Sequence, residues 1–91
     1  MATTEVERAF ARTPVGHIHY ASAGDGDPVL FLHQTPRSWD EFRDVIPIVG
    51  AGGYRAIAMD TIGYGDSDKP DDPASLPLFG SGVIGLMDAL G

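Results

Sequence analysis

The spacing of apolar and polar residues at the start of the chain predicts a β-hairpin. Residues 5–12 and 17–23 each alternate, with some irregularity, between apolar and polar side chains, as expected of strands with one buried face. Residues 13–16 (TPVG) have the composition of a tight turn, because proline fixes one φ angle and glycine accepts a positive one. The two segments are therefore expected to pair with each other.

The pattern changes further along the chain and predicts a strand–helix–strand unit. Residues 29–32 are apolar without alternation, which is typical of a strand buried on both faces of a parallel sheet. Residues 39–49 carry apolar side chains at helical spacing, and residues 54–60 form a second short apolar strand. Strands connected in this way run parallel, with a right-handed crossover. Together with the hairpin, this unit predicts an α/β fold.

The helix over residues 39–49 is expected to begin at Ser38. Ser38 and Glu41 have the spacing of a capping box, in which each side chain binds a free backbone N–H of the first turn. Pro47 lies inside the helical pattern and lacks an N–H, so it is expected to kink or shorten the last turn.

A second helix is predicted at the end of the sequence. Its apolar positions at helical spacing are Leu78 or Phe79, Val83, Leu86, Met87 and Leu90. Residues 80–85 also match the G-x-G-x-x-G pattern of dinucleotide-binding loops. That pattern requires a strand directly before it, whereas prolines at 73 and 77 indicate a loop and a helix start. We therefore interpret the match as a coincidence in a glycine-rich chain.

Composition restricts the function classes. The 91 residues suffice for one small domain, and the absence of cysteine excludes disulfides and thiolate-bound zinc. Thirteen acidic residues against six Lys and Arg give a net charge of −7, which disfavours binding to nucleic acid or to anionic membranes. The polar N-terminus differs from a signal peptide, so a cytoplasmic location is expected.

Two polar loops are expected where chemistry occurs in such folds. Residues 33–36 and 60–70 follow the carboxyl ends of the two predicted parallel strands, the edge at which open α/β sheets bind ligands. The segments VLFLHQTPRSW and AIAMDTIGYGDSDKP resemble the N-terminal part of α/β-hydrolases. In that family an HGxP loop follows the third strand, and a D-x-x-G-x-G-x-S-D-x-P stretch follows the fourth. The positions matching the second pattern are Asp60, Gly63, Gly65, Ser67, Asp68 and Pro70.

The resemblance implies roles for the first loop. The backbone N–H of Thr35, with Gln34 beside it, would contribute to an oxyanion hole, while His33 and Pro36 would shape the loop. Gln34 stands where the family usually has glycine, and a positive φ there would cost about 1–3 kcal/mol. Trp39 would either line the substrate pocket or pack in the core.

The same resemblance implies an incomplete site. The sequence contains no G-x-S-x-G nucleophile elbow, so residues 1–91 are expected to be an incomplete α/β-hydrolase domain, truncated before the nucleophile strand and inactive alone. The catalytic acid and the catalytic histidine of the family would also lie after residue 91. The complete enzyme would hydrolyse an ester or related bond of a small molecule through a covalent intermediate, without a cofactor. A serine nucleophile would indicate esterase-like chemistry, and an aspartate a dehalogenase or epoxide hydrolase.

A non-catalytic function is the alternative. In the family's strand order, residues 54–60 lie between the hairpin and residues 29–33, which leaves the latter strand with one unpaired edge. An unpaired apolar edge can bind a strand of another chain, so a truncated remnant or binding module is also consistent with the sequence.

No metal site is expected. His17 and His19 lie two residues apart and would share one face of a strand, but no third ligand is evident, so both are interpreted as surface or packing residues. The acidic residues of the second loop lack the spacing of a calcium-binding loop and are interpreted as solvated.

Overall fold

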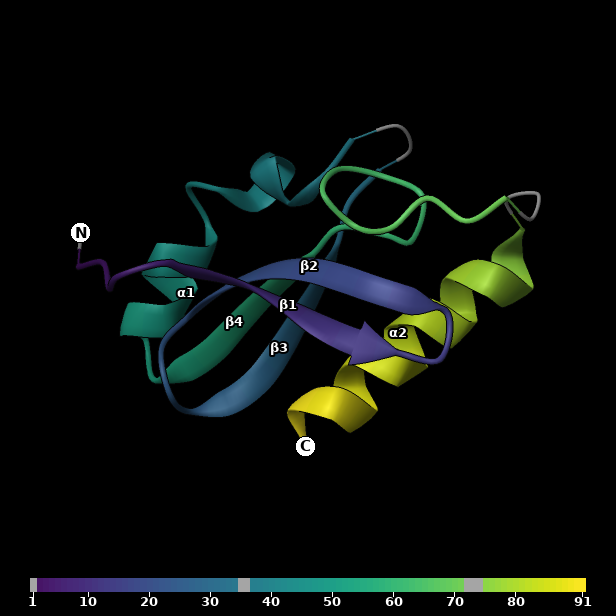
Figure 1. Cartoon of the computed structure of the whole chain (residues 1–91). Helices are drawn as coiled ribbons and strands as arrows, with labels where there is room; N and C mark the ends of the chain where they lie inside the picture. Colours follow the sequence, from purple (N-terminus) through teal and green to yellow (C-terminus); the bar gives the residue numbers. More distant parts are fainter. Residues whose placement is uncertain (1, 35–36, 72–74) are drawn as a thin grey trace.

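The computed structural model describes residues 2–34, 37–71 and 75–91. Its strands form one four-stranded sheet in the order β1-β2-β4-β3 (Figure 1). The elements are β1 (Glu7–Thr13), β2 (Gly16–Ala23), β3 (Asp27–Leu32), the 3₁₀ helix η1 (Trp39–Phe42), α1 (Ile46–Ala51), β4 (Tyr54–Met59) and α2 (Leu76–Leu90).

The hairpin and the strand order agree with the sequence analysis. Strands β1 and β2 are antiparallel, and Gly16 closes their turn with a φ of 128°, which favours glycine. Strand β4 pairs antiparallel with β2 and parallel with β3. Within the described sheet, β3 therefore pairs on one side only, as predicted.

The prediction of one continuous helix over residues 39–49 is wrong, and so is the capping box. The Ser38 hydroxyl does not cap the helix, because it donates to Asp40 Oδ1 at 2.8 Å. Glu41 instead accepts from the backbone N–H of Gln34 at 2.8 Å, so its carboxylate binds the preceding loop. The segment forms a short 3₁₀ helix, η1, followed by the separate helix α1.

The expected effect of Pro47 is also wrong. Pro47 lies in the first turn of α1, where a backbone N–H has no partner within the helix in any case. The proline therefore helps to start α1 rather than to end a longer helix.

Helix α2 begins two residues before the earliest predicted apolar position. The Ser75 hydroxyl caps it by accepting from the Leu78 N–H at 3.2 Å. A Cβ at Gly85 would lie 2.8 Å from the Cβ of Thr13, so this glycine allows α2 to approach β1 closely. Residues 80–85 lie wholly inside the helix, which removes the strand–loop context that a dinucleotide-binding loop needs.

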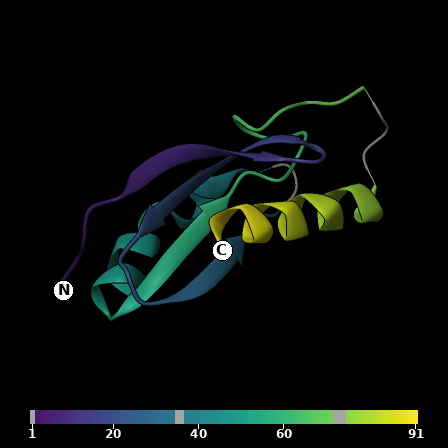
Figure 2. The same cartoon turned by 60° about the horizontal axis from the view of Figure 1, so that its bottom comes forward.

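The two faces of the sheet carry separate hydrophobic cores, with α2 on one face and η1 and α1 on the other (Figure 2). Ile57 and Met59 of β4 point to the α2 face, whereas Ala56 and Ala58 point to the opposite face. This alternation explains why residues 56–59 of β4 are apolar without interruption. In the described part of the chain, no helix combines the length and the apolar character needed to cross a membrane.

Candidate functional site

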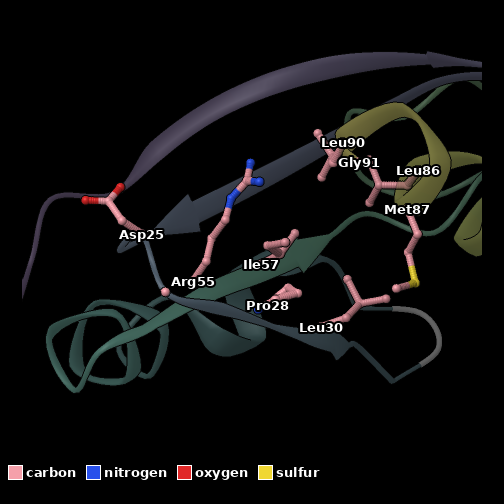
Figure 3. A pocket seen from close by; sticks show the side chains of 10 residues that line it. Asp25, Pro28, Leu30, Arg55, Ile57, Leu86, Met87, Leu90 and Gly91 are labelled. Carbon is pink, nitrogen blue, oxygen red and sulfur yellow. The ribbon is translucent and has the colours of Figure 1, made fainter.

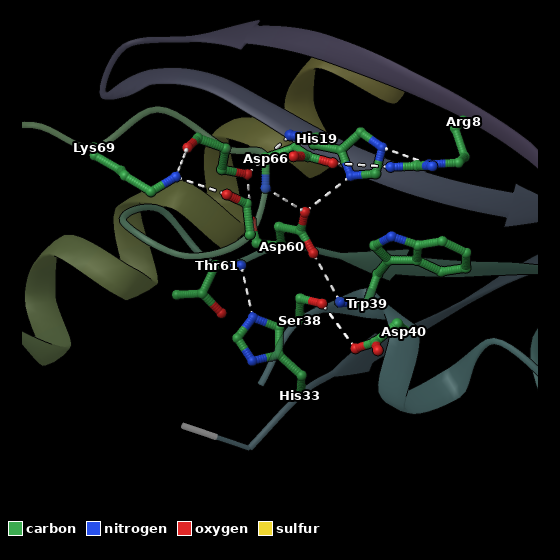
Figure 4. Close-up of polar contacts among 12 residues, drawn as sticks. Arg8, His19, His33, Ser38, Trp39, Asp40, Asp60, Thr61, Asp66 and Lys69 are labelled. Atoms are coloured by element: carbon green, nitrogen blue, oxygen red, sulfur yellow. Dashed lines mark hydrogen bonds and ion pairs between the residues drawn. The ribbon is translucent and has the colours of Figure 1, made fainter. Parts of the chain in front are cut away.

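The two loops predicted to carry chemistry lie at the same edge of the sheet. Leu32 and Met59 are paired in register as the last residues of the parallel strands β3 and β4, so His33 and Asp60 follow side by side. The backbone N–H of Thr61 donates to His33 Nε2 at 2.9 Å (Figure 4). The carboxyl ends of neighbouring parallel strands form the edge where α/β folds bind ligands.

His33 joins these two loops in one defined tautomer. Its Nε2 accepts from Thr61, so the ring proton lies on Nδ1, which is 2.8 Å from the carbonyl oxygen of Gln34. A neutral imidazole satisfies both contacts, and the ring also packs edge-on against Tyr64 at a centroid distance of 5.8 Å. These contacts give His33 a means of shaping the first loop.

Gln34 is held by Glu41. Its backbone N–H donates to Glu41 Oε1 at 2.8 Å, its side-chain amide donates to Oε2 at 3.2 Å, and its carbonyl accepts from the Arg37 N–H at 2.6 Å. No described non-glycine residue has a positive φ, so the backbone strain considered for Gln34 does not arise. In this conformation the Gln34 N–H donates to the Glu41 carboxylate and is not available to another acceptor. Thr35 and Pro36 lie outside the described residues.

Trp39 packs in the core on the η1 side of the sheet. Its side chain is 4% exposed and contacts a cluster that includes Ala21 and Ile46. Two guanidinium groups lie over its ring, with the Cζ of Arg43 at 4.4 Å and that of Arg8 at 5.2 Å from the centroid. This placement supports the core alternative over a pocket-lining one.

Asp60 is fully buried and accepts hydrogen bonds from separate segments of the chain. Its Oδ1 accepts from the Trp39 N–H at 2.7 Å, and its Oδ2 accepts from His19 Nδ1 and from the Asp66 N–H, each at 2.9 Å (Figure 4). A buried carboxylate is tolerated when such donors replace its hydration. Asp60 therefore ties β2, η1 and the loop after β4 together.

The partner of Asp60 on β2 is His19, which is 2% exposed. Its Nε2 accepts from Arg8 Nε at 3.1 Å, and Arg8 Nη2 binds Asp66 Oδ2 at 2.8 Å. A surface or packing role was expected for His19, and its bond to Asp60 was not predicted from the sequence. The available signal was that His19 shares its strand face with Ala21 and Ala23, which are small and apolar and indicate a buried face.

Among the described residues, His19, Asp60 and Asp66 form the cluster with metal-ligand spacing, since their ligand atoms lie within 4.8 Å of one another. The Arg8 guanidinium bonds both His19 and Asp66, and its positive charge disfavours a cation there. His17, the other histidine considered as a ligand, lies near Asp68 at 3.4 Å on the exposed side. The cluster is a hydrogen-bond network with an internal cation.

The second loop depends on glycine and on Ser67. Gly65 has a φ of 52°, and a Cβ there would clash with the Asp60 carboxylate. The Ser67 hydroxyl donates to the carbonyl oxygen of Asp60 at 2.7 Å and accepts from the His19 N–H at 2.9 Å. The glycine and serine positions of the motif thus hold the loop against β2 and β4.

Comparison with known proteins agrees with this geometry, although no family model matches the chain. The sequence is 40% identical over 90 residues to epoxide hydrolase 1 of Siraitia grosvenorii, covering 96% of this chain and 28% of the relative. A haloalkane dehalogenase of Mycobacterium marinum is 45% identical over 67 residues, covering 71% and 23%.

Solved structures give the same result. The crystal structure of epoxide hydrolase VrEH1 from Vigna radiata superimposes with a TM-score of 0.89 at 34% identity, covering 96% of this chain and 29% of that one. The haloalkane dehalogenase DatA from Agrobacterium tumefaciens C58 gives 0.85 at 33% identity, covering 93% and 29%.

The fold and the loop motifs therefore identify the chain as homologous to the N-terminal portion of α/β-hydrolases, which confirms the predicted family and fold class. Within that superfamily its relatives are epoxide hydrolases and haloalkane dehalogenases. The chain spans less than a third of the length of these relatives: 28% of the first epoxide hydrolase and 23% of the dehalogenase.

Proposed function

We propose that the chain supplies the oxyanion-loop region of a hydrolase that opens an epoxide or displaces a halide from a small molecule. The observation that carries this proposal is the meeting of the loops after β3 and β4 at one edge of the sheet, through the bond between Thr61 and His33. The names of the relatives favour these substrates, and an ester is the alternative substrate for the same machinery.

The chemistry explains why such an enzyme needs this loop. A carboxylate nucleophile attacks the substrate carbon and forms an ester, while the carbon–oxygen or carbon–halogen bond breaks. An epoxide oxygen then takes up a proton and becomes a hydroxyl, whereas a halide leaves as an anion. Water attacks the ester carbonyl, and the tetrahedral oxyanion that forms needs preorganised N–H donors, each worth about 3 kcal/mol.

In this proposal the Thr35 N–H is the donor from the first loop, with Gln34 beside it and with His33 and Pro36 shaping the path. The Gln34 N–H becomes a second donor only when it leaves Glu41. The nucleophile, the catalytic acid and the catalytic histidine are not among residues 1–91, and no cofactor is required. We also propose a cytoplasmic location.

The test compares the 91-residue chain with the product of its complete reading frame. We expect the longer product to turn over an aryl epoxide or a 1-haloalkane, and the 91-residue chain to turn over neither. The coding sequence should show a strand ending in aspartate within about fifteen residues of Gly91, by analogy with the strand-to-nucleophile turn of the fold. Turnover by the purified 91-residue chain would contradict the proposal, as would a stop codon directly after Gly91.

An interaction module is the second candidate, and the unpaired edge of β3 favours it. A groove of about 290 Å³ lies between this edge and the end of α2 (Figure 3). Its apolar lining includes Leu30, Ile57, Leu86, Met87 and Leu90. Leu32 is 53% exposed and Met87 is 52% exposed. An extended apolar strand of another chain could therefore bind the backbone of β3 and contact these side chains.

Size-exclusion chromatography and thermal melting of the 91-residue chain test this second candidate. Association with itself or with an added strand-forming partner would favour it. A sharp, cooperative melt of a stable monomer would contradict it, because a monomer of that kind would not need its open edge covered.

A further inference from the structure

The Asp60 carboxylate and its partners extend the site beyond the two loops. Asp60 bonds Trp39 at one end of segment 33–39, and the next residue, Thr61, bonds His33 at the other end. His33 and Trp39, which lie on the two sides of the undescribed residues 35–36, are therefore attached to two consecutive residues that follow β4. Asp60 can position Trp39 only if its own carboxylate is fixed. His19 binds that carboxylate, and Arg8 binds His19.

We propose that Arg8, His19 and Asp60 form a positioning network that sets the place of the first loop from the hairpin side of the sheet. These residues act through Trp39 and are not themselves catalytic. The inference rests on the proposed function, since positioning matters for catalysis only if the first loop supplies oxyanion donors. The network itself is nevertheless a property of the 91-residue chain that can be measured without substrate.

The contacts of His19 define its protonation state. The acceptors of Asp60 require a proton on Nδ1, and the guanidinium of Arg8 requires a lone pair on Nε2, because arginine is always a donor. The neutral tautomer with the proton on Nδ1 satisfies both partners. A doubly protonated ring would direct an N–H at the Arg8 N–H, so the network excludes that form in this conformation.

Arg8 is suited to this place by the shape of its side chain. Its Nε binds His19 at 3.1 Å while its Nη2 binds Asp66 at 2.8 Å, and Asp66 in turn donates its backbone N–H to Asp60. The planar guanidinium presents both donors in a fixed geometry, which a lysine ammonium does not. Arg8 thus closes a ring of contacts around the buried pair of His19 and Asp60.

The first experiment records the imidazole nitrogens of His19 by NMR in the ¹⁵N-labelled 91-residue chain. We expect Nδ1 to resonate as a protonated nitrogen and Nε2 as an unprotonated one at neutral pH. A proton on Nε2, or on both nitrogens, would overturn the proposal. His17 is an internal reference, because its ring is exposed and lies next to Asp68 instead of the network.

The second experiment measures amide hydrogen exchange at Trp39. In Asp60→Asn, one carboxylate oxygen is replaced by an NH₂ group, which cannot accept a hydrogen bond. If the remaining oxygen keeps the two bonds of Oδ2, to His19 and to Asp66, the NH₂ group faces the Trp39 N–H. We expect exchange at Trp39 to become at least about tenfold faster, because a bond to a charged acceptor is lost. The matched control is Asp68→Asn, which removes a carboxylate that accepts the His17 N–H at 2.8 Å from the same loop.

Unchanged exchange at Trp39 in Asp60→Asn would overturn the proposal, as would an equal acceleration in the Asp68 control. An unprotected Trp39 amide in the unmodified chain would overturn it as well.

A rescue experiment separates positioning from simple filling of space, and it keeps the proposal testable if Asp60→Asn does not fold. Asparagine at position 19 retains a donor near the place of Nδ1, whereas leucine fills the space without one. We expect Trp39 exchange in His19→Asn to stay near the unmodified value and in His19→Leu to rise at least about tenfold. Equal exchange in the two variants would overturn the proposal. A failure of the hydrolase assay would leave these results unchanged, so the two proposals fail separately.

Discussion

Asp60 accepts a hydrogen bond from the backbone N–H of Trp39 at 2.7 Å, although the two residues are 21 positions apart in the sequence. The bond joins the end of β4 to the start of η1, and it is fully shielded from water on the Asp60 side. Because buried charged groups need partners, this contact constrains both segments at once. Its loss should affect the stability of the protein and the order of the first loop.

Replacement of Asp60 by alanine should be among the most destabilising single changes. The buried donors of His19 and Trp39 and the partly buried N–H of Asp66 would then lose their acceptor, and each buried donor left unsatisfied costs about 1–3 kcal/mol. We expect the free energy of unfolding, measured by urea denaturation, to fall by about 3 kcal/mol or more. Asp68→Ala is the control, and it should cost about 1 kcal/mol or less because Asp68 is half exposed. Equal losses in the two variants would contradict this account.

Two glycines of α2 should respond to alanine with opposite signs. At Gly85 the new Cβ would lie 2.8 Å from Thr13, so we expect a loss of about 1–3 kcal/mol from overpacking. At Gly80 no atom lies within 4 Å of the new Cβ, so alanine should stabilise the helix by about 0.5–1 kcal/mol. Thermal melting of the pair measures both effects. Stabilisation by Gly85→Ala would show that α2 does not pack closely on β1.

Removal of the Glu41 carboxylate should release the first loop without unfolding the chain. In Glu41→Ala the N–H and the side-chain amide of Gln34 lose their acceptors, both in an exposed setting. We expect faster amide exchange at Gln34 and a change in unfolding free energy of about 1 kcal/mol or less. Asp40→Ala, which removes the acceptor of Ser38 instead, should leave Gln34 exchange unchanged. Slow exchange at Gln34 in Glu41→Ala would contradict this role.

A charge at the open edge should reduce association of the 91-residue chain with itself. Lysine at Leu32 places an ammonium at the end of the unpaired strand β3, where charges oppose edge pairing. Light scattering should report less aggregate for Leu32→Lys than for the unmodified chain. The control is Ile84→Lys, on an exposed part of α2 that does not line the groove. A similar decrease in both variants would indicate a general effect of charge.

The proposed donor at Thr35 predicts a difference between two substitutions in the complete enzyme. Thr35→Pro removes the backbone N–H and should lower kcat about 100-fold or more, the usual effect of losing an oxyanion donor. Thr35→Ala keeps the N–H and should retain most of the activity. Similar activity in the two variants would argue against a backbone donor at this position.

The sequence was sufficient for elements whose signal is local. The hairpin follows from the turn at residues 13–16, and the parallel strands follow from uninterrupted apolar runs. The helix over residues 39–49 was predicted incorrectly because its apolar spacing does not reveal which partners the polar side chains choose. Glu41 binds Gln34 instead of capping a helix, and Pro47 starts a new helix.

The sequence by itself determined the α/β class, the strand order through its family resemblance, and the presence of two loops at one sheet edge. These depend on the period of apolar residues and on motifs whose spacing is readable along one chain. Only the tertiary structure decided that His19 binds Asp60 and Arg8 binds His19, and that Trp39 is buried with two arginines over its ring. Such contacts join residues of four separate segments. Their geometry exists only after the strands have paired, because hydrogen bonding and burial depend on distances that sequence spacing does not fix.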